Sequence, residues 1–247
     1  MKLSKEVFTI KKIPKVIWSS EDSFNLKPKP LTFVLLVFGL FLFGLGESLL
    51  ITSGAGVGPY TVLAQGISNL TGWSIGLSTF IISIFVLLLW IPLKQKPGMG
   101  TILNAFIIAL TIEFSVYYLP YPQYYPFQVL QVVIGVLTIG IGSGFYLIAN
   151  LGAGPRDGLM IGLQKISNLP IYSIRTSIEV SVVIVGSLCL LNNIEKLLGE
   201  VVGLGTAIFA LGIGPSVALG ITIVGRYLKN NPLPFNLELK KIKLIYG

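Results

Sequence analysis

The sequence predicts an all-α integral membrane protein whose helices form two similar halves. The chain is apolar and poor in charge, its apolar residues gather in long runs, and it matches itself over four ordered blocks. Of its 247 residues, 53% are hydrophobic and 11% are charged, and the mean hydropathy is +0.83. A soluble domain carries about 25% charged residues. Much of this protein's surface is therefore expected to face lipid.

Six apolar runs are long enough for membrane spans, since a helix needs about 20 such residues to cross the hydrocarbon core. The expected spans are Leu31 to Thr52, Ser74 to Leu93, Thr101 to Leu119, Pro126 to Asn150, Tyr172 to Leu191 and Val201 to Val224. Two shorter stretches, Pro59 to Leu70 and Pro155 to Leu169, each begin at a Gly-Pro step. Proline is favoured in the first turn of a helix, so we expect two short helices, either interfacial or re-entrant.

Basic residues alternate between the connections. The N-terminal segment, the loop with Lys94 and Lys96, the connection with Arg156 and Lys165, and the C-terminal tail are basic. The three connections between them hold one basic residue, Lys196. Cytoplasmic loops carry the excess of Lys and Arg. Both termini are therefore expected in the cytoplasm, with the chain in a bacterial plasma membrane. The net charge is +8, and the basic residues that produce it flank the apolar runs. We therefore expect them to contact lipid headgroups, and we expect no binding of nucleic acid.

An internal repeat links the two halves of the chain. Four blocks recur in the same order: Gly44–Gly46 with Gly140–Gly142, Gly56–Pro59 with Gly152–Pro155, Ser68–Leu70 with Ser167–Leu169, and Gly98–Thr101 with Gly203–Thr206. The expected organisation is a basic segment 1–30, repeat 31–119, repeat 126–224 and a basic tail 225–247. Three spans per repeat make the second copy enter the membrane from the opposite side, as in many secondary transporters.

Broken helices at the interface of such repeats commonly hold the substrate site. The corresponding loop residues here are Gly56, Gly58, Pro59, Gly152, Gly154 and Pro155. Duplication also produces scaffolds that transport nothing, so the repeat alone leaves both readings open. The steps around Gly140, Gly142 and Gly144 are instead expected to serve close packing between helices.

Few ionisable residues fall within or beside the spans, and such residues usually face a bundle interior or a wet cavity. Arg175 and Glu179 are four residues apart and share a helix face. They are either a self-neutralising pair near the interface or part of a site for an anionic group. Glu47 lies about 24 Å along its span at 1.5 Å per residue, and Glu113 also falls in the outer half. Either carboxylate suits proton or sodium binding, or is simply neutral there.

Arg156 and Asp157 open the second short helix, where free backbone N–H groups attract anions. The matching positions of the first half hold Tyr60 and Thr61. The candidate binding residues are thus Arg156, Asp157, Arg175, Glu179 and Glu47. The sequence has no histidine and one cysteine, Cys189. We therefore expect no catalytic residue, metal or cofactor, and no enzyme activity.

The run Gly152–Met160, followed by Arg175, Glu179 and Gly203–Thr206, resembles the YczE/YitT-like family of bacterial integral membrane proteins. The resemblance extends from about Leu31 to Val224 and implies a multi-pass protein described as a permease without an assigned activity.

The leading hypothesis is a small secondary transporter for an anionic or zwitterionic solute. The alternative is a membrane accessory protein that binds or regulates a partner protein. Self-association into a homo-oligomer is compatible with both hypotheses.

Overall fold

The computed structural model describes residues 13–167, 169, 171–198 and 200–230. Within these residues the chain is helical and contains no β-strand, which confirms the all-α class. Most of the C-terminal tail lies outside the described residues. The helices are α1 Pro30–Ser53, α2 Pro59–Thr71, α3 Ile75–Leu89, α4 Met99–Ser115, α5 Tyr125–Ala149, α6 Pro155–Ser167, α7 Ile171–Leu188, α8 Ile194–Leu197 and α9 Leu204–Asn230.

Helix ends follow local chemistry. The two short helices α2 and α6 begin at Pro59 and Pro155, as expected. Gly54 and Asn150 end α1 and α5 in the left-handed conformation that terminates many helices. Helix α3 ends at Leu89, four residues before the expected Leu93. Pro92 explains this, because proline removes a backbone donor and disfavours helix in the residue before it.

Three helices are long and apolar enough to cross a membrane, namely Pro30–Ser53, Tyr125–Ala149 and Leu204–Arg226. The pair α2 and α3 adds a fourth if it is one span, although its two helices meet at 114°. Helix α4 is apolar but has 17 residues, about 25 Å at 1.5 Å per residue. By length and composition alone, the described residues thus contain three or four candidate spans, and the six spans expected from the sequence stay a prediction.

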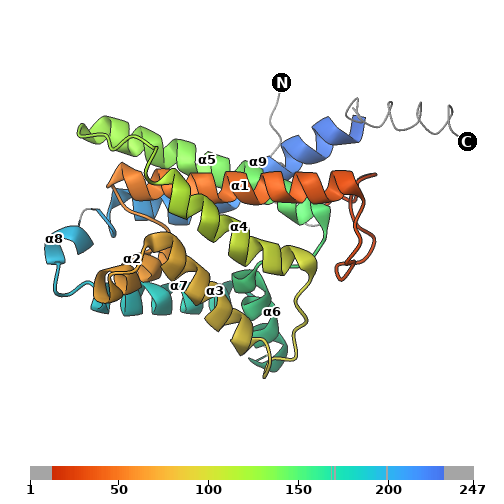
Figure 1. Cartoon of the computed structure of the whole chain (residues 1–247), viewed down its shortest axis with the longest axis horizontal. Coiled ribbons are helices and arrows are strands. Elements are labelled where there is room, and N and C mark those ends of the chain that lie inside the picture. The colour runs from red at the N-terminus through yellow and green to blue at the C-terminus, as the bar shows by residue number, and fades with distance from the viewer. Residues whose placement is uncertain (1–12, 168, 170, 199, 231–247) are drawn as a thin grey trace, which may run out of the picture.

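The helices form two layers (Figure 1). In one layer α4 packs on α1, α1 on α5, and α5 on α9. In the other, α2 contacts α3 and α7, and α6 contacts the same two helices, so that the four form a ring. Contacts of α4 with α3 and α6 join the layers. The apolar core lies mainly along α1 and α5, where Leu36, Leu40 and Ile139 are fully buried.

Glycines allow the long helices to approach closely, as the sequence indicated. A Cβ on Gly142 would lie 2.5 Å from the Gly39 carbonyl oxygen of α1. On the other side of α5, a Cβ on Gly144 would lie 2.5 Å from the backbone of Gly220 in α9. Because lipid tails are as apolar as the helix surfaces, no hydrophobic effect drives helices together within a membrane, and close packing through small residues takes its place.

The described part of the N-terminal segment, residues 13–29, packs against the bundle. Trp18 is 4% exposed and its carbonyl oxygen accepts a hydrogen bond from Thr32 of α1. The Ser20 N–H donates to the Ala149 carbonyl at 3.0 Å, and Asn150 Nδ2 donates to the Ser20 carbonyl at 2.9 Å. Residues 13–29 therefore cover the end of α5 and the beginning of α1.

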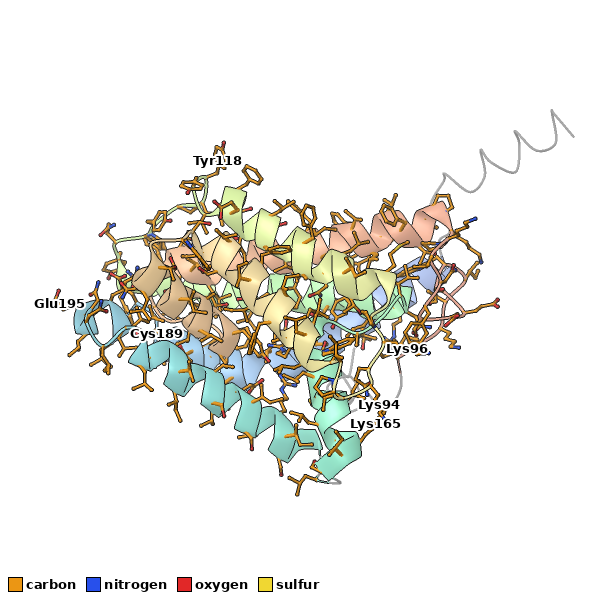
Figure 2. All side chains as sticks on the ribbon, turned by 60° about the horizontal axis from the view of Figure 1, so that its bottom comes forward. Lys94, Lys96, Tyr118, Lys165, Cys189 and Glu195 are labelled. Atoms are coloured by element: carbon orange, nitrogen blue, oxygen red, sulfur yellow. The ribbon has the colours of Figure 1, made fainter. Side chains whose placement is uncertain are left out.

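Figure 2 shows that the labelled residues of the connections lie toward different ends of the molecule. Lys94, Lys96 and Lys165 lie toward one end, and Tyr118 and Glu195 lie toward the other. Lys165 Nζ donates to the Gln95 side chain at 3.4 Å, which ties two of the basic connections together. The connections that hold Lys94, Lys96 and Lys165 thus lie toward the same end of the molecule.

Candidate functional site

A cavity of about 530 Å³ lies between the two layers. Its walls come from α1, α2, α3, α4, α5, α6, α7 and α9, so segments far apart in the sequence meet there. Small-molecule sites in proteins measure about 300 to 1,000 Å³. The polar and charged side chains of its lining are Glu47, Tyr60, Thr61, Thr79, Ser83, Asn104, Ser143, Tyr146, Arg156, Asp157 and Arg175.

The beginning of α6 carries two of the charged residues. Trp90, just after α3, fixes this helix start, since its Nε1–H donates to the Pro155 carbonyl at 3.0 Å. The Trp90 ring lies directly against Gly158, where any Cβ would overlap it. Backbone N–H groups in a first helical turn lack partners within the helix. The local sequence therefore sets Arg156, Asp157 and these N–H groups at the cavity wall.

Arg156 lies between a carboxylate and an aromatic ring. Its Nε is 4.0 Å from Asp157 Oδ1, at the outer limit of an ion pair. Its guanidinium carbon is 5.4 Å from the centroid of the Tyr60 ring, within the range of a cation–π contact. Asp157 is held by Tyr146 of α5, whose hydroxyl donates to Oδ2 at 2.6 Å. The arrangement fixes the carboxylate more firmly than the guanidinium.

Glu47 enters the cavity from the C-terminal part of α1 and is 7% exposed. Its Oε2 accepts a hydrogen bond of 2.7 Å from the Thr61 hydroxyl of α2. The Glu47 side chain is thereby fixed against the start of α2. A buried carboxyl group with one hydroxyl donor is suited to bind a proton or a cationic group.

Arg175 and Glu179 form an ion pair, with 2.9 Å between Arg175 Nε and Glu179 Oε1. Arg175 lines the cavity and its side chain is 44% exposed, whereas Glu179 contacts the cavity only through Arg175. The pair neutralises itself while Arg175 faces the cavity, so both interpretations of the pair stay predictions.

Glu113 lies apart from the cavity. A Cβ on Gly76 of α3 would be 2.5 Å from Glu113 Oε2, so the carboxyl packs against that helix. Glu113 Oε2 is buried and has no hydrogen-bond partner among the described residues. The two outer carboxylates considered from the sequence therefore have different surroundings.

The Gly-x-Gly-Pro loops act mainly as connectors between the halves. Gly56 and Gly152 both have φ of 116°, a conformation that L-residues rarely adopt. The Gly205 N–H at the start of α9 donates to the Ala55 carbonyl at 2.6 Å. The Gly100 N–H at the start of α4 donates to the Leu151 carbonyl at 2.7 Å.

Of the six predicted loop residues, Gly154 and Pro155 line the cavity, while Gly56, Gly58, Pro59 and Gly152 lie outside its lining.

The cavity unites four of the five predicted binding residues, and Glu179 is one contact away. Sequence reasoning missed Thr61, Tyr146, Trp90 and Asn104 as members or supports of the site. A signal existed for Thr61, which occupies the position of Asp157 in the other half. In the described part of the chain no group of three or more acidic or cysteine residues is arranged to hold a metal ion. The arrangement suits reversible binding of a small polar solute.

The fold and this cavity define a multi-pass helical membrane protein with a polar site among its helices. Residues 31–221 match the family of unknown function DUF6198, and the chain belongs to this YczE-like membrane family. No solved structure matches the chain.

Three curated relatives are similar. An uncharacterized protein of Haemophilus influenzae is 40% identical over 88% of this chain and 94% of its own length. The uncharacterized membrane protein YczE of Bacillus subtilis is 29% identical over 58% of this chain and 68% of its own. The uncharacterized protein YyaS of the same organism is 28% identical over 56% and 71%. The resemblance noted from the sequence is thereby confirmed.

Proposed function

We propose that this protein is a small secondary transporter for an anionic or zwitterionic solute. The observation that carries the proposal is the cavity of about 530 Å³, which unites Glu47, Arg156, Asp157 and Arg175. A charge within a bilayer costs about 2.5 to 3.5 kcal/mol even on insertion scales. Four such residues around one cavity are more than packing requires, and solute binding accounts for them.

An inverted 3+3 repeat of six spans belongs to the same proposal, and matched contacts support it. The loop after α1 bonds to the start of α9, and the loop after α5 bonds to the start of α4. Exchanging the halves, so that α1 replaces α5, α2 replaces α6, α3 replaces α7 and α4 replaces α9, reproduces the packing order within both layers. Transporters with such repeats alternate access by rocking one half against the other.

The orientation with both termini in the cytoplasm also belongs to the proposal. It is supported by the gathering of Lys94, Lys96 and Lys165 toward one end of the molecule in Figure 2. Because cytoplasmic loops are enriched in basic residues, this end faces the cytoplasm. The more neutral end, with Tyr118 and Glu195, then faces outward.

A ligand screen tests the proposal against the partner-binding alternative. Thermal stability of the detergent-purified full chain is measured with a library of organic acids, amino acids and other metabolites. A ligand at 100 times its Kd adds about 2.7 kcal/mol of stability. We expect a hit that is lost in Arg156→Gln and kept in Glu195→Gln, a matched control at an exposed residue far from the cavity.

A well-folded protein without any hit contradicts solute binding. The partner-binding alternative additionally expects deletions in the terminal segments to impair function more than Arg175→Ala does. Proteins that co-purify with the full chain then become the subject of study.

A further inference from the structure

The charges around the cavity divide into satisfied and unsatisfied groups. Arg175 and Glu179 neutralise each other at 2.9 Å. Asp157 holds the Tyr146 hydroxyl at 2.6 Å. These groups have partners within the protein. Arg156 makes no hydrogen bond to another described residue, and Glu47 has a hydroxyl donor but no cationic nitrogen within 4.0 Å among the described residues. Both side chains face the same cavity.

The guanidinium of Arg156 has unused donors. It presents five N–H groups, yet it makes no hydrogen bond to another described residue, and its ion pair with Asp157 extends to 4.0 Å. The adjacent Tyr60 hydroxyl is buried and also lacks a hydrogen-bond partner among the described residues. A carboxylate matches the planar fork of arginine with two parallel hydrogen bonds. This side of the cavity is therefore suited to an acid group.

The Glu47 carboxylate has room for further hydrogen-bond donors and for a cation. Among the described residues no lysine or arginine nitrogen lies within 4.0 Å of its carboxylate, and its one hydrogen bond comes from Thr61. A carboxylate accepts about four hydrogen bonds. A primary ammonium group supplies three donors and a compensating charge. This side of the cavity is therefore suited to an amine.

We propose that the solute is a zwitterion that bridges the cavity, with its ammonium group on Glu47 and its acid group on Arg156. This inference rests on the proposed function and narrows its solute class. An anion alone gives Glu47 no donor besides the Thr61 hydroxyl, and an amine alone leaves the N–H groups of Arg156 without a hydrogen-bonded acceptor. Buried charges are costly unless paired, so the bridging solute satisfies both. Ile82, Val86 and Ile108 also line the cavity and supply apolar walls for an aliphatic body.

Matched probes of one chain length test the inference on the purified full chain. The probes are 4-aminobutanoate, butanoate and butylamine, with glycine and 3-aminopropanoate added to vary the distance between the charges. Binding is measured by calorimetry and by thermal stabilisation. We expect at least one zwitterion to bind, and the two singly charged analogues to bind at least tenfold more weakly than 4-aminobutanoate or the best zwitterion.

Two variants separate the poles. Glu47→Gln should weaken zwitterion binding at least tenfold while leaving butanoate binding within about twofold of wild type. Arg156→Gln should weaken it similarly while leaving butylamine unaffected. Glu195→Gln, at an exposed position in α8, should change none of these values. If a variant fails to fold, the comparison of probes on the wild-type protein still decides the matter.

Equal binding of butanoate and 4-aminobutanoate to the wild type overturns the inference, because the ammonium group would then add nothing to the affinity through Glu47. Absence of zwitterion binding to a folded protein overturns it as well. Transport is judged separately. Binding of a zwitterion without flux across a membrane supports this inference and refutes the transporter. Flux of a purely anionic solute supports the transporter and refutes this inference.

Discussion

Arg156 and Tyr60 occupy corresponding positions of the two sequence halves, and they meet in the structure with 5.4 Å between the guanidinium carbon and the ring centroid. The second residue of each short helix thus contacts its counterpart. This places the boundary between the halves inside the cavity. It also explains why the charged Gly154–Gly158 run has an aromatic rather than a charged counterpart, since two arginines there would repel each other.

The Tyr60 ring and its hydroxyl should contribute differently to stability. Tyr60→Phe removes a buried hydroxyl that has no hydrogen-bond partner among the described residues, so we expect little change or a slight gain in thermal stability. Tyr60→Leu removes the ring beneath Arg156 and should cost about 0.5 to 2 kcal/mol from the cation–π contact, besides any loss of packing. Thermal unfolding in one detergent compares the two. A larger loss for Tyr60→Phe would contradict the geometry.

Gly56 and Gly152 should be the two most sensitive glycines of the loops. Alanine there must adopt φ of 116°, which costs about 1 to 3 kcal/mol. Its Cβ would also lie 2.7 Å from Thr206 in the first case and from Thr101 in the second. We expect Gly56→Ala and Gly152→Ala to lower the unfolding temperature by similar amounts.

Two other glycines serve as controls for this prediction. Gly72 has φ of 74° and no neighbouring atom within 4 Å of a built Cβ, so Gly72→Ala reports the backbone cost alone. Gly214 lies in α9 with no such neighbour and without positive φ, so Gly214→Ala should be neutral or stabilising. A Gly72→Ala loss as large as that of Gly152→Ala would refute the role of the loop contacts.

The hydrogen bond from Thr61 to Glu47 should appear as energetic coupling. Thr61→Val leaves the buried carboxyl without its donor and should cost about 1 to 3 kcal/mol. Made in a Glu47→Leu background, the same change should cost less, because no acceptor is then left unsatisfied. A double-mutant cycle of thermal unfolding measures the difference. Additive effects of the two substitutions would contradict the observed 2.7 Å contact.

Much of the helix pattern could be predicted from the sequence, since apolar runs and Gly-Pro steps are local signals. The beginnings of α1, α2, α5 and α6 fall within one residue of their expected positions. The cavity could be predicted only through its charged members, because a charge in an apolar run is conspicuous. Trp90 and Asn104 gave no signal, as their roles depend on contacts between distant segments, and Thr61 was marked only by its match to Asp157 in the other half.

The number of membrane spans is harder to predict, because apolar composition alone does not report where a helix bends or stops. Helices α3 and α4, with 15 and 17 residues, are both shorter than the apolar stretches expected at their positions. The packing of residues 13–29 around Trp18 was also missed. A lysine-rich segment has the composition of an exposed one, and Trp18 is not part of a periodic apolar pattern that would indicate burial.

The six-span arrangement with cytoplasmic termini predicts which connections face outward. Single cysteines are introduced in a Cys189→Ser background by Lys94→Cys, Lys165→Cys, Tyr118→Cys and Glu195→Cys. A membrane-impermeant maleimide should label the last two in intact cells and the first two only after the cells are opened. Labelling of Lys94→Cys from outside would instead favour three spans, because the whole connection between α1 and α5 would then lie outside.

The most direct test of the central claim is solute uptake by the full chain reconstituted in liposomes. The vesicles are exposed to a defined mixture of amino acids and organic acids, and their contents are analysed by mass spectrometry. The account predicts accumulation of at least one solute, abolished by Glu47→Gln and Arg156→Gln and unchanged by Glu195→Gln. No accumulation by folded, reconstituted protein, or accumulation that both cavity variants leave intact, would contradict transport through this cavity.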